Sequence, residues 1–475
     1  MAYTTIDDPS EFFHTQLYVG NETNRTITND GNSDLQPDFI WVKNRTHGED
    51  NNLVNTSVGV DKYLISNSNS AEATDTDRCT GVTSDGFSIG TDHRWNRSSG
   101  NYVAWQWKAG GTAPTKTYKV VVVSDSGNKY RFRNSGDTAT YAASAVTLDL
   151  QEGGTYIFDQ SDSSNSGHPL RFSTTSNGTH GGGSEYTTGV TTSGTAGNAG
   201  AFTQITVAAS APTLYYYCTQ HSAMGGQVNT NSTHGQTNFD GDILSVSQEN
   251  TKAGFSIVTY TGNGNGSDQT IGHGLGAECK VVFAKMRSDA GDSWRIFHED
   301  VSQSGGGNFF LNGTSPLDTG DPARIKSTNT STVTLLAYSS GYNAVNASGK
   351  NYVAYCFSEI KGYSKFGTYT GDGSTSDGTF VYMGFKPQWI LIKRNATESW
   401  IISDTTRDPF NKSDAEEYIL ADSAGAAYAG VQYDFVSNGF KLRAASQNVS
   451  GAVYTYYAFA EHPFVSSKGV PTTAR

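Results

Sequence analysis

The sequence has little charge and few residues that build long helices. Only 16% of its 475 residues are charged, against about 25% in an average globular domain. Long exposed helices need alternating acidic and basic side chains to stay soluble, so this composition argues against a helical protein. Glycine is frequent, and 12% of the residues are aromatic, which excludes a disordered chain. We therefore expect a loop-rich, all-β protein whose length corresponds to roughly three domains of ~150 residues.

The sequence also lacks the features of nucleic-acid binding and membrane insertion. Its 45 acidic and 33 basic residues give a net charge of −12 without a basic run, so it should repel phosphate backbones. Apolar stretches such as Val120–Val123 are far shorter than the ~20 residues of a membrane helix. Residues 1–16 have neither the cationic start nor the apolar core of a secretory signal. We expect no nucleic-acid partner, no membrane insertion, and four cysteines that stay reduced in a cytoplasm.

One module occurs three times along the chain. It begins with an alternating strand, a Gly/Asn turn and a second strand that ends in lysine. The tyrosine and the lysine that mark these two strands lie 25, 25 and 24 positions apart in the three copies. The pairs are Tyr18 and Lys43, Tyr260 and Lys285, and Tyr369 and Lys393. The copies also end alike, with NYVAWQW from Asn101, NYVAYCF from Asn351 and TYYAFA from Thr455.

The repeated segments are typical of strands in a β-sandwich. They alternate or are short and apolar, contain many β-branched and aromatic residues, and are bounded by Gly, Asn, Asp and Ser turns. We expect tandem antiparallel, jelly-roll-like sandwiches in which the first and last strands of each copy lie side by side. A helical turn is expected only at Ser413–Leu420. The predicted domains are repeat 1 at 1–110, a separate domain at 111–250, repeat 2 at 251–362, and repeat 3 with a short C-terminal tail at 363–475.

The separate domain carries the strongest chemical motif of the chain. A strand-like LYYY run is followed by Cys218, His221 and Met224 in a Cys-x2-His-x2-Met pattern, and His168 lies upstream after a Ser/Asn loop. Two imidazoles and a thiolate with a weak axial thioether are the ligands of blue-copper sites. Methionine is scarce, with four in the whole chain, so one at this spacing is informative. The pattern indicates a copper site in which a hairpin loop supplies three of the ligands.

This segment resembles the cupredoxin family, in particular the short ligand loop of its amicyanin-like members. The resemblance covers residues 117–230 and implies a Greek-key sandwich with His168, Cys218, His221 and Met224 as copper ligands. A glycine-rich insertion at Thr179–Gly200 departs from the family, and flanking domains are foreign to electron carriers. The alternative is a cupredoxin-like fold without metal, in which Cys218 and Met224 pack as core residues. His180 and His234 lie in Gly/Ser-rich loops and are expected to be solvated.

The chain as a whole resembles structural proteins of marine tailed bacteriophages, described as tail-fibre or virion proteins. The resemblance implies a structural component of the virion, favouring a tail-fibre or other surface-projecting protein that mediates assembly and host contact. A capsid decoration protein is the alternative. The implied partners are other virion proteins, copies of the chain itself in a homotrimer, and a host surface glycan or protein. The strings that carry the resemblance are MAYTTIDDPSEFF, PDFIWVKNR, GYSKFGTYTGDGS and SSNSGHPLRFSTTS.

An enzyme is the alternative of another class, either a copper-binding redox enzyme or a glycan-cleaving tail protein. Multicopper oxidases use His-x-His pairs for their trinuclear site, and none occurs among the 10 histidines. The parallel β-helix repeats of the usual depolymerase scaffold are also missing. No catalytic residue follows from the phage resemblance, so we do not expect the chain to be an enzyme.

Overall fold

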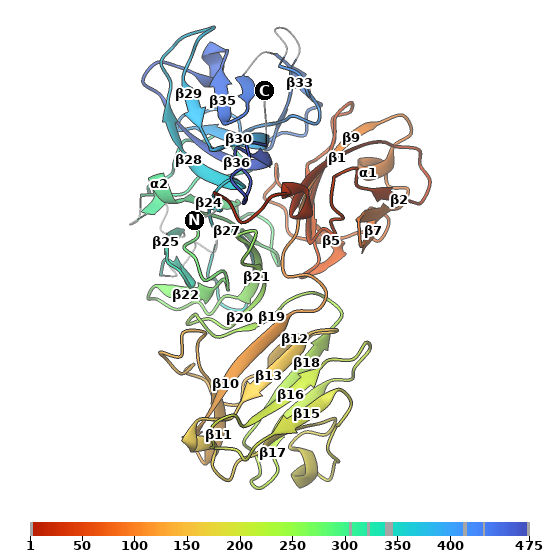
Figure 1. Cartoon of the computed structure of the whole chain (residues 1–475), viewed down its shortest axis with the longest axis vertical. Helices are drawn as coiled ribbons and strands as arrows, with labels where there is room; N and C mark the ends of the chain where they lie inside the picture. The colour runs from red at the N-terminus through yellow and green to blue at the C-terminus, as the bar shows by residue number, and fades with distance from the viewer. Residues whose placement is uncertain are drawn as a thin grey trace.

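The computed structural model describes residues 3–303, 306–320, 324–337, 345–411, 416–430 and 433–472. The all-β prediction is confirmed: strands form every sheet, and the described helices are single short turns (Figure 1). Three modules, one for each repeat, and one inserted domain share the chain. We name them module 1 (3–110), the inserted domain (111–231), module 2 (236–362) and module 3 (363–472). No helix of the described residues is long and apolar enough to cross a membrane.

Module 1 is a sandwich of a six-stranded and a three-stranded sheet. The large sheet has the order β1-β9-β3-β4-β5-β6, and the small sheet has the order β2-β8-β7. Its elements are η1 (Pro9–Glu11), β1 (Phe13–Val19), β2 (Arg25–Thr28), β3 (Phe39–Asn44), β4 (Asn52–Asn55), β5 (Gly59–Ile65), β6 (Ala73–Thr74), β7 (Cys79–Thr83), β8 (Gly86–Ile89), α1 (His93–Asn96) and β9 (Asn101–Trp107).

Module 2 repeats the small sheet and the first four strands of the large sheet, and has the hairpin β19–β20 at the opposite edge in place of counterparts of β5 and β6. Its large sheet runs β19-β20-β21-β27-β23-β24 and its small sheet β22-β26-β25. The elements are β19 (Gln236–Asn238), β20 (Ser245–Asn250), β21 (Phe255–Thr261), β22 (Gln269–Gly272), β23 (Val281–Met286), β24 (Arg295–His298), α2 (Glu299–Ser302), β25 (Ile325–Thr328), β26 (Thr332–Leu335) and β27 (Asn351–Phe357).

Module 3 has the same strand order as module 1. Its large sheet runs β28-β36-β30-β31-β32-β33 and its small sheet β29-β35-β34. The elements are β28 (Ser364–Thr370), β29 (Phe380–Tyr382), β30 (Phe385–Arg394), β31 (Ile401–Asp404), β32 (Glu417–Leu420), β33 (Tyr428–Ala429), β34 (Tyr433–Val436), β35 (Gly439–Leu442), η5 (Ala445–Gln447) and β36 (Val453–Pro463).

The first and last strands of each repeat, β1 and β9, β21 and β27, and β28 and β36, are antiparallel neighbours, as the repeat predicts. In each pair the repeat's tyrosine lies opposite a second tyrosine, and the two rings stack. The stacked pairs are Tyr18 and Tyr102 at 4.9 Å, Tyr260 and Tyr352 at 5.0 Å, and Tyr369 and Tyr454 at 4.8 Å between ring centroids. This shared stack fixes the strand register, because a slip by one residue would turn each ring to the other face of the sheet.

The helical turn expected at Ser413–Leu420 is wrong where the structure describes it. Glu417–Leu420 forms strand β32, which pairs with β31 and buries Ile419. Residues 413–415 lie outside the described residues. Local helix propensity is a weak preference, and pairing with a neighbouring strand overrides it here.

The sheet of module 2 extends beyond the boundary expected at residue 250. Strands β19 and β20, which the sequence placed in the separate domain, pair with each other and with β21. They cover the edge of the large sheet that β21 would otherwise expose, and an uncovered edge invites pairing with another chain.

The inserted domain is a sandwich of a five-stranded and a four-stranded sheet. The sheets run β11-β10-β13-β16-β15 and β12-β18-β17-β14, with β10 parallel to β13 and β12 parallel to β18. Figure 1 shows this domain at one end of the long axis and module 3 at the other. Its elements are β10 (Thr115–Ser124), β11 (Asn128–Phe132), β12 (Leu148–Gln151), β13 (Thr155–Asp159), η2 (Ser163–Asn165), β14 (Leu170–Ser173), η3 (Gly178–Gly181), β15 (Val190–Ser193), β16 (Phe202–Thr206), β17 (Leu214–Cys218) and β18 (Gln227–Asn231).

The three modules share one aromatic core. Buried residues from all three large sheets form a single cluster, while each module keeps a smaller core of its own. Aromatic rings join every pair of modules within this cluster. Examples are Phe39 and Tyr355 at 4.3 Å for modules 1 and 2, Phe283 and Tyr457 at 5.7 Å for modules 2 and 3, and Trp107 and Trp389 at 5.6 Å for modules 1 and 3.

Equivalent lysines close the modules into a ring. Each repeat's lysine is fully buried and donates from Nζ to a backbone carbonyl of another module. The bonds are Lys43 to Ala424 at 2.9 Å, Lys285 to Asn69 at 3.5 Å, and Lys393 to Thr314 at 3.2 Å. Module 1 thus reaches module 3, module 3 reaches module 2, and module 2 reaches module 1. The three modules are thus joined in a cycle within one chain, and the homotrimer stays a prediction.

A second layer of contacts follows the same cycle. In each module, the residue just before the fourth strand of the repeat (β4, β24 or β31) donates a side-chain hydrogen bond. The acceptor lies in the same neighbouring module that the buried lysine contacts. Trp294 Nε1 donates to Ile65 O and Trp400 Nε1 to Phe310 O, both at 2.9 Å. In module 1 this position is Asn51, whose Nδ2 donates to Leu420 O at 3.2 Å. The ring is therefore built from equivalent positions of the repeat.

Burial lowers the pKa of Lys43, Lys285 and Lys393 to about 8. In the unfolded chain a lysine titrates near 10.4. Between these values the unfolded chain binds more protons than the folded chain, so the free energy of unfolding must rise with pH. The slope for one lysine is at most about 1.4 kcal/mol per pH unit.

We expect Lys285→Met to remove one third of this dependence. Urea unfolding at pH 7.5 and pH 9.5 should give a free energy that rises with pH less steeply in the variant than in the wild type. Titration of the tyrosines contributes equally to the pH dependence of both chains, so this contribution cancels in the comparison. Lys350→Met, at a partly exposed lysine paired with Asp289, is the matched control and should keep the wild-type slope. Equal slopes for Lys285→Met and the wild type would contradict the assignment.

Candidate metal centre

Strand pairing brings the predicted ligands together at one end of the inserted domain. Cys218 is the last residue of β17 and lies opposite Leu170 of β14, so His168 reaches it from just before β14. His221 and Met224 follow in the loop between β17 and β18. Gly225 lets this loop return close to its own strand, because a Cβ there would lie 1.7 Å from Tyr216 O. The three ligands from one loop and the fourth from a neighbouring strand agree with the predicted layout.

The two imidazoles and the thiol are arranged around one point. Nδ1 of His168 and Nδ1 of His221 each lie 3.8 Å from Cys218 Sγ, and all three ligand atoms lie within 4.8 Å of one another. Metal bonds of ~2.3 Å to sulfur and ~2.0 Å to nitrogen, at tetrahedral or trigonal angles, place a sulfur and a nitrogen about 3.5–3.7 Å apart. The two sulfur–nitrogen separations are therefore close to those around a copper or zinc ion.

Met224 lies in the same core cluster as Cys218 and is fully buried. Its carbonyl accepts a hydrogen bond from Tyr130 N at 2.9 Å, which fixes the backbone at the end of the ligand loop. This position agrees with both sequence interpretations of Met224, the core residue and the weak axial ligand. Its role as a ligand stays a prediction.

Hydrogen bonds around the centre hold the ligands in place. The carbonyl of His168 accepts from Tyr130 Oη at 2.7 Å and from Gln160 Nε2 at 2.9 Å. The outer ring nitrogen of His168, Nε2, lies 3.4 Å from the side-chain amide of Asn128, so Nδ1 is the nitrogen left to face the thiol. Gln220 N donates to Cys218 Sγ at 3.4 Å, which helps to hold the sulfur in position. Such outer contacts orient ligands and tune the metal.

The centre is buried on one side and open on the other. Cys218 is fully buried and His168 nearly so, whereas His221 is exposed. Burial, aided by the neighbouring His221, lowers the pKa of His168 and keeps its imidazole neutral. A neutral imidazole is the form that binds a metal. An ion bound here would be shielded from solvent on the side of Cys218 and His168 and accessible on the side of His221.

The segment 177–180, at the start of the glycine-rich insertion, clamps both ends of the ligand loop. Asn177 Oδ1 accepts a hydrogen bond from Ala223 N at 2.7 Å, and His180 Nε2 bonds to Cys218 O at 3.0 Å. Between them Gly178 lies on the ring of Tyr217, where a Cβ would come within 2.5 Å. His180 is exposed, as expected, but it is bonded to the ligand loop rather than free in solvent. Sequence reasoning missed this role, because neither residue has metal-ligand spacing.

His234 was expected to be solvated, and this is wrong. Its Nδ1 lies 3.0 Å from Oδ1 of the buried Asp38, and its backbone N donates to Thr56 O at 3.0 Å. These contacts tie the segment after the inserted domain to module 1, so His234 has a structural environment and takes no part in the metal centre.

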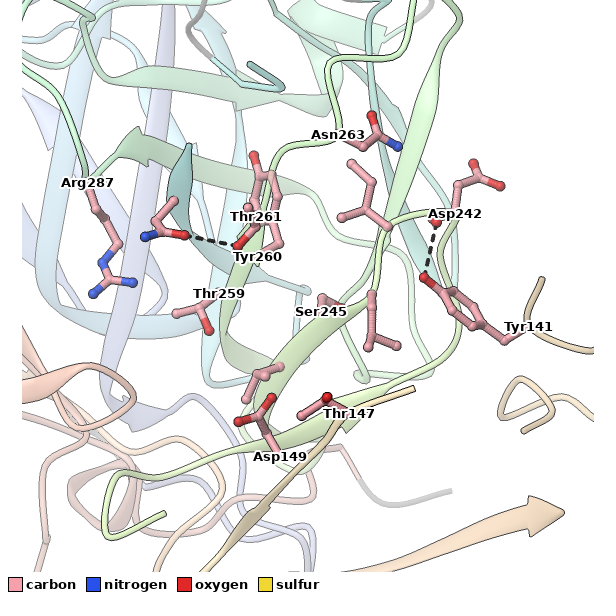
Figure 2. A pocket seen from close by; sticks show the side chains of 14 residues that line it. Tyr141, Thr147, Asp149, Asp242, Ser245, Thr259, Tyr260, Thr261, Asn263 and Arg287 are labelled. Atoms are coloured by element: carbon pink, nitrogen blue, oxygen red, sulfur yellow. Dashed lines mark hydrogen bonds between the residues drawn. The ribbon is translucent and has the colours of Figure 1, made fainter. Parts of the chain in front are cut away.

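A second cavity, of about 470 Å³, lies between the inserted domain and module 2 (Figure 2). Three of its polar side chains are bonded to protein partners. Tyr141 Oη donates to Asp242 O at 3.5 Å, and Thr261 bonds to Asn351 at 2.9 Å (Figure 2). Arg287 is held by Glu72 from module 1 at 2.7 Å. This cavity is a seam between the inserted domain and module 2.

Comparison with known proteins gives one family and little else. The model of a family described as "Domain of unknown function (DUF7483)" matches residues 8–168 and 227–463. The segment between these ranges, which holds Cys218, His221 and Met224, lies outside the match. No curated protein matches the chain. A solved structure titled "Crystal Structure of the STIV MCP" is 9% identical, covers 43% of this chain and 86% of its own, and has a TM-score of 0.13, too low to indicate a shared fold.

We expect the clamp to restrain the ligand loop even without metal. In His180→Ala the bond to Cys218 O is lost, so amide hydrogens of 218–224 should exchange with deuterium several-fold faster, while those of β10 and β13 keep their rates. His180→Gln can still donate to the carbonyl and should retain slow exchange. If His180→Ala leaves the loop's exchange unchanged, the bond does not restrain it.

Proposed function

The chain belongs to the family described as a domain of unknown function, DUF7483, and we propose that it is a structural protein on the surface of a virus particle. One observation carries the proposal: three sandwiches close into a ring around one shared core. No module can open without exposing aromatic surface of the other two, so the body must unfold as a unit. Cooperative opening slows unfolding, which suits a particle that persists outside cells. The sequence resemblance to phage structural proteins points in the same direction.

Within the particle, the closed body supports capsid decoration. A trimeric fibre buries its threefold core between three chains, whereas this chain completes such a core alone. It can therefore be added to a lattice as a single folded unit that projects the inserted domain. A tail fibre is the second candidate and rests on the sequence resemblance alone.

The particle assignment is tested by locating the chain. Purified particles should contain it by mass spectrometry, and gold-labelled antibody should mark the head surface in electron micrographs. Labelling confined to the tail would favour the fibre over decoration. Absence from purified particles that contain the other structural proteins would falsify the assignment.

We further propose that the inserted domain binds copper through His168, Cys218, His221 and Met224. The fit of the first three ligand atoms to one ion supports this, as does the mixed sulfur and nitrogen set, which suits both oxidation states of copper. Bound copper would supply one-electron chemistry, or it would cross-link β14 to the β17–β18 loop. Because the family match leaves out residues 169–226, the site rests on this chain's own residues.

Copper binding is tested by absorption spectroscopy of the purified chain. Added Cu(II) should produce an intense visible thiolate-to-copper band, which Cys218→Ala abolishes. Met224→Leu should shift this band, whereas Met383→Leu, a buried methionine of module 3, should not. Cys356→Ala in module 2 serves as the thiol control and should keep the band. A wild-type chain without the band would leave only the metal-free interpretation.

A further inference from the structure

An exposed aromatic pair lies on the small sheet of module 3. Phe380 and Tyr382 are alternate residues of β29, and they are 44% and 50% exposed, whereas Val381 between them is buried. Alternate residues of a strand point to the same side of a sheet. Both rings therefore stand on the outer face of the sheet, away from the core that Val381 joins.

The other two modules supply an internal reference for these positions. Strand pairing aligns Val381, opposite Phe440, with Ile27, opposite Phe87, and with Ile271, opposite Val333. The flanking positions are therefore Thr26 and Thr28 in module 1, and Thr270 and Gly272 in module 2. Modules 1 and 2 have small residues at both positions on the same backbone, so the fold does not need the two aromatic rings.

Lysines surround the aromatic pair, again in module 3 alone. Lys441 lies directly opposite Phe380, where module 1 has Ser88 and module 2 has Thr334. Lys365 Nζ lies 5.5 Å from the centroid of the Tyr382 ring and donates to Tyr382 O at 3.1 Å. By strand register its counterparts are His14 and Ser256.

The N-terminal segment extends the same surface. Tyr3 Oη donates to Gly384 O at 2.8 Å, and Lys361 Nζ lies 4.6 Å from the Tyr3 ring centroid. Burial and a hydrogen bond with Tyr382 raise the pKa of Tyr3, so the two hydroxyls are neighbours. We call the set Tyr3, Lys361, Lys365, Phe380, Tyr382 and Lys441 the aromatic–lysine face.

The charge of this face differs from that of the whole chain. Lys441 is paired with Asp377, and the carboxylate of Glu359 interacts with Lys365 at longer range, but among the described residues Lys361 and Lys365 form no direct ion pair. At physiological salt, charges beyond about 8 Å are largely screened, so a ligand here senses these lysines rather than the net charge of −12. Two ammonium groups without a direct ion pair, and a third that Asp377 shares, lie next to two exposed rings and form a surface for an anion that also has apolar faces.

We propose that the aromatic–lysine face binds an anionic polysaccharide. The rings of Phe380 and Tyr382 would stack on the C–H faces of sugar rings, and the lysines would pair with carboxylate or sulfate groups. A neutral glycan would leave the ammonium groups without partners, and a purely ionic ligand would leave the rings exposed. Polysaccharide binding would mediate host contact only if the chain lies on the particle surface, so this inference rests on the proposed function. It involves neither the metal centre nor its loop.

The chain offers a sharp test, because its own modules specify tolerated replacements. The double variant Phe380→Thr, Tyr382→Thr installs the residues of module 1, and Lys365→Ser, Lys441→Ser installs residues found in modules 2 and 1. Both should fold with an unchanged melting temperature. The control Thr26→Ala, Thr28→Ala alters the equivalent face of module 1.

Binding is measured by affinity electrophoresis and biolayer interferometry of the full chain. Alginate offers carboxylates, carrageenan offers sulfates, and dextran is the neutral comparison. The wild type and the module 1 control should bind alginate or carrageenan, and the polymer bound identifies the acid group. Each double variant should bind at least tenfold more weakly, and the lysine variant should lose most of its dependence on salt.

Three results would overturn the proposal: no binding of either anionic polymer, equal binding by the variants, or equal binding of dextran. Sedimentation measures the competing use of the face. If the wild type self-associates, the aromatic variant is a 50.9 kDa monomer, and no polymer binds, the face contacts a second copy instead. If the chain binds polysaccharide but is absent from purified particles, the virion proposal is wrong and the binding inference still holds.

Discussion

The structure depends on an aromatic core that no single module can bury. Each large sheet presents one apolar face to its own small sheet and the other to the centre, where the rings of all three modules meet. A sheet that is apolar on both faces must be covered on both, so the modules are stable only together. The ring of lysine and tryptophan bonds follows from this. The strand ends that carry Lys43, Lys285 and Lys393 are drawn inside, and each ammonium group must find carbonyl oxygens there to offset its lost hydration.

The inserted domain is fixed to this body rather than hung from a free linker. The segment that leaves it places Phe239 in the domain's own core, where the ring stacks on Phe132 at 4.8 Å. The same segment then forms β19 and β20 at the edge of module 2, and His234 anchors it to Asp38 of module 1. Strand β17, which ends at Cys218, is labelled at the end of the domain that lies far from the three modules (Figure 1).

Strand patterns predicted the fold within each module but could not predict the ring. The spacing from Tyr18 to Lys43, repeated twice, identified strands that do pair, because alternation and turn residues are local signals. The ring rests on contacts such as Lys43 to Ala424, which are 381 positions apart and have no local signature. The missed boundary has a similar cause: β19 (QTN) is buried but polar, so it does not read as a strand. At the metal centre, residue type and spacing identified three ligand residues that meet. The clamp by Asn177 and His180 depends on how a glycine-rich loop folds back, which no spacing indicates.

Three copies of one backbone separate what the fold requires from what it carries. Positions that agree in all modules, the stacked tyrosines and the buried lysines, are those that fix register and close the ring. A position that differs in one module, on a backbone that accepts small residues elsewhere, is free of that constraint. Phe380 and Tyr382 are such positions, and the inserted domain is a larger example, since it occupies one of the two links between modules. Specific chemistry is therefore placed where symmetry is broken, because a change there leaves the shared core untouched.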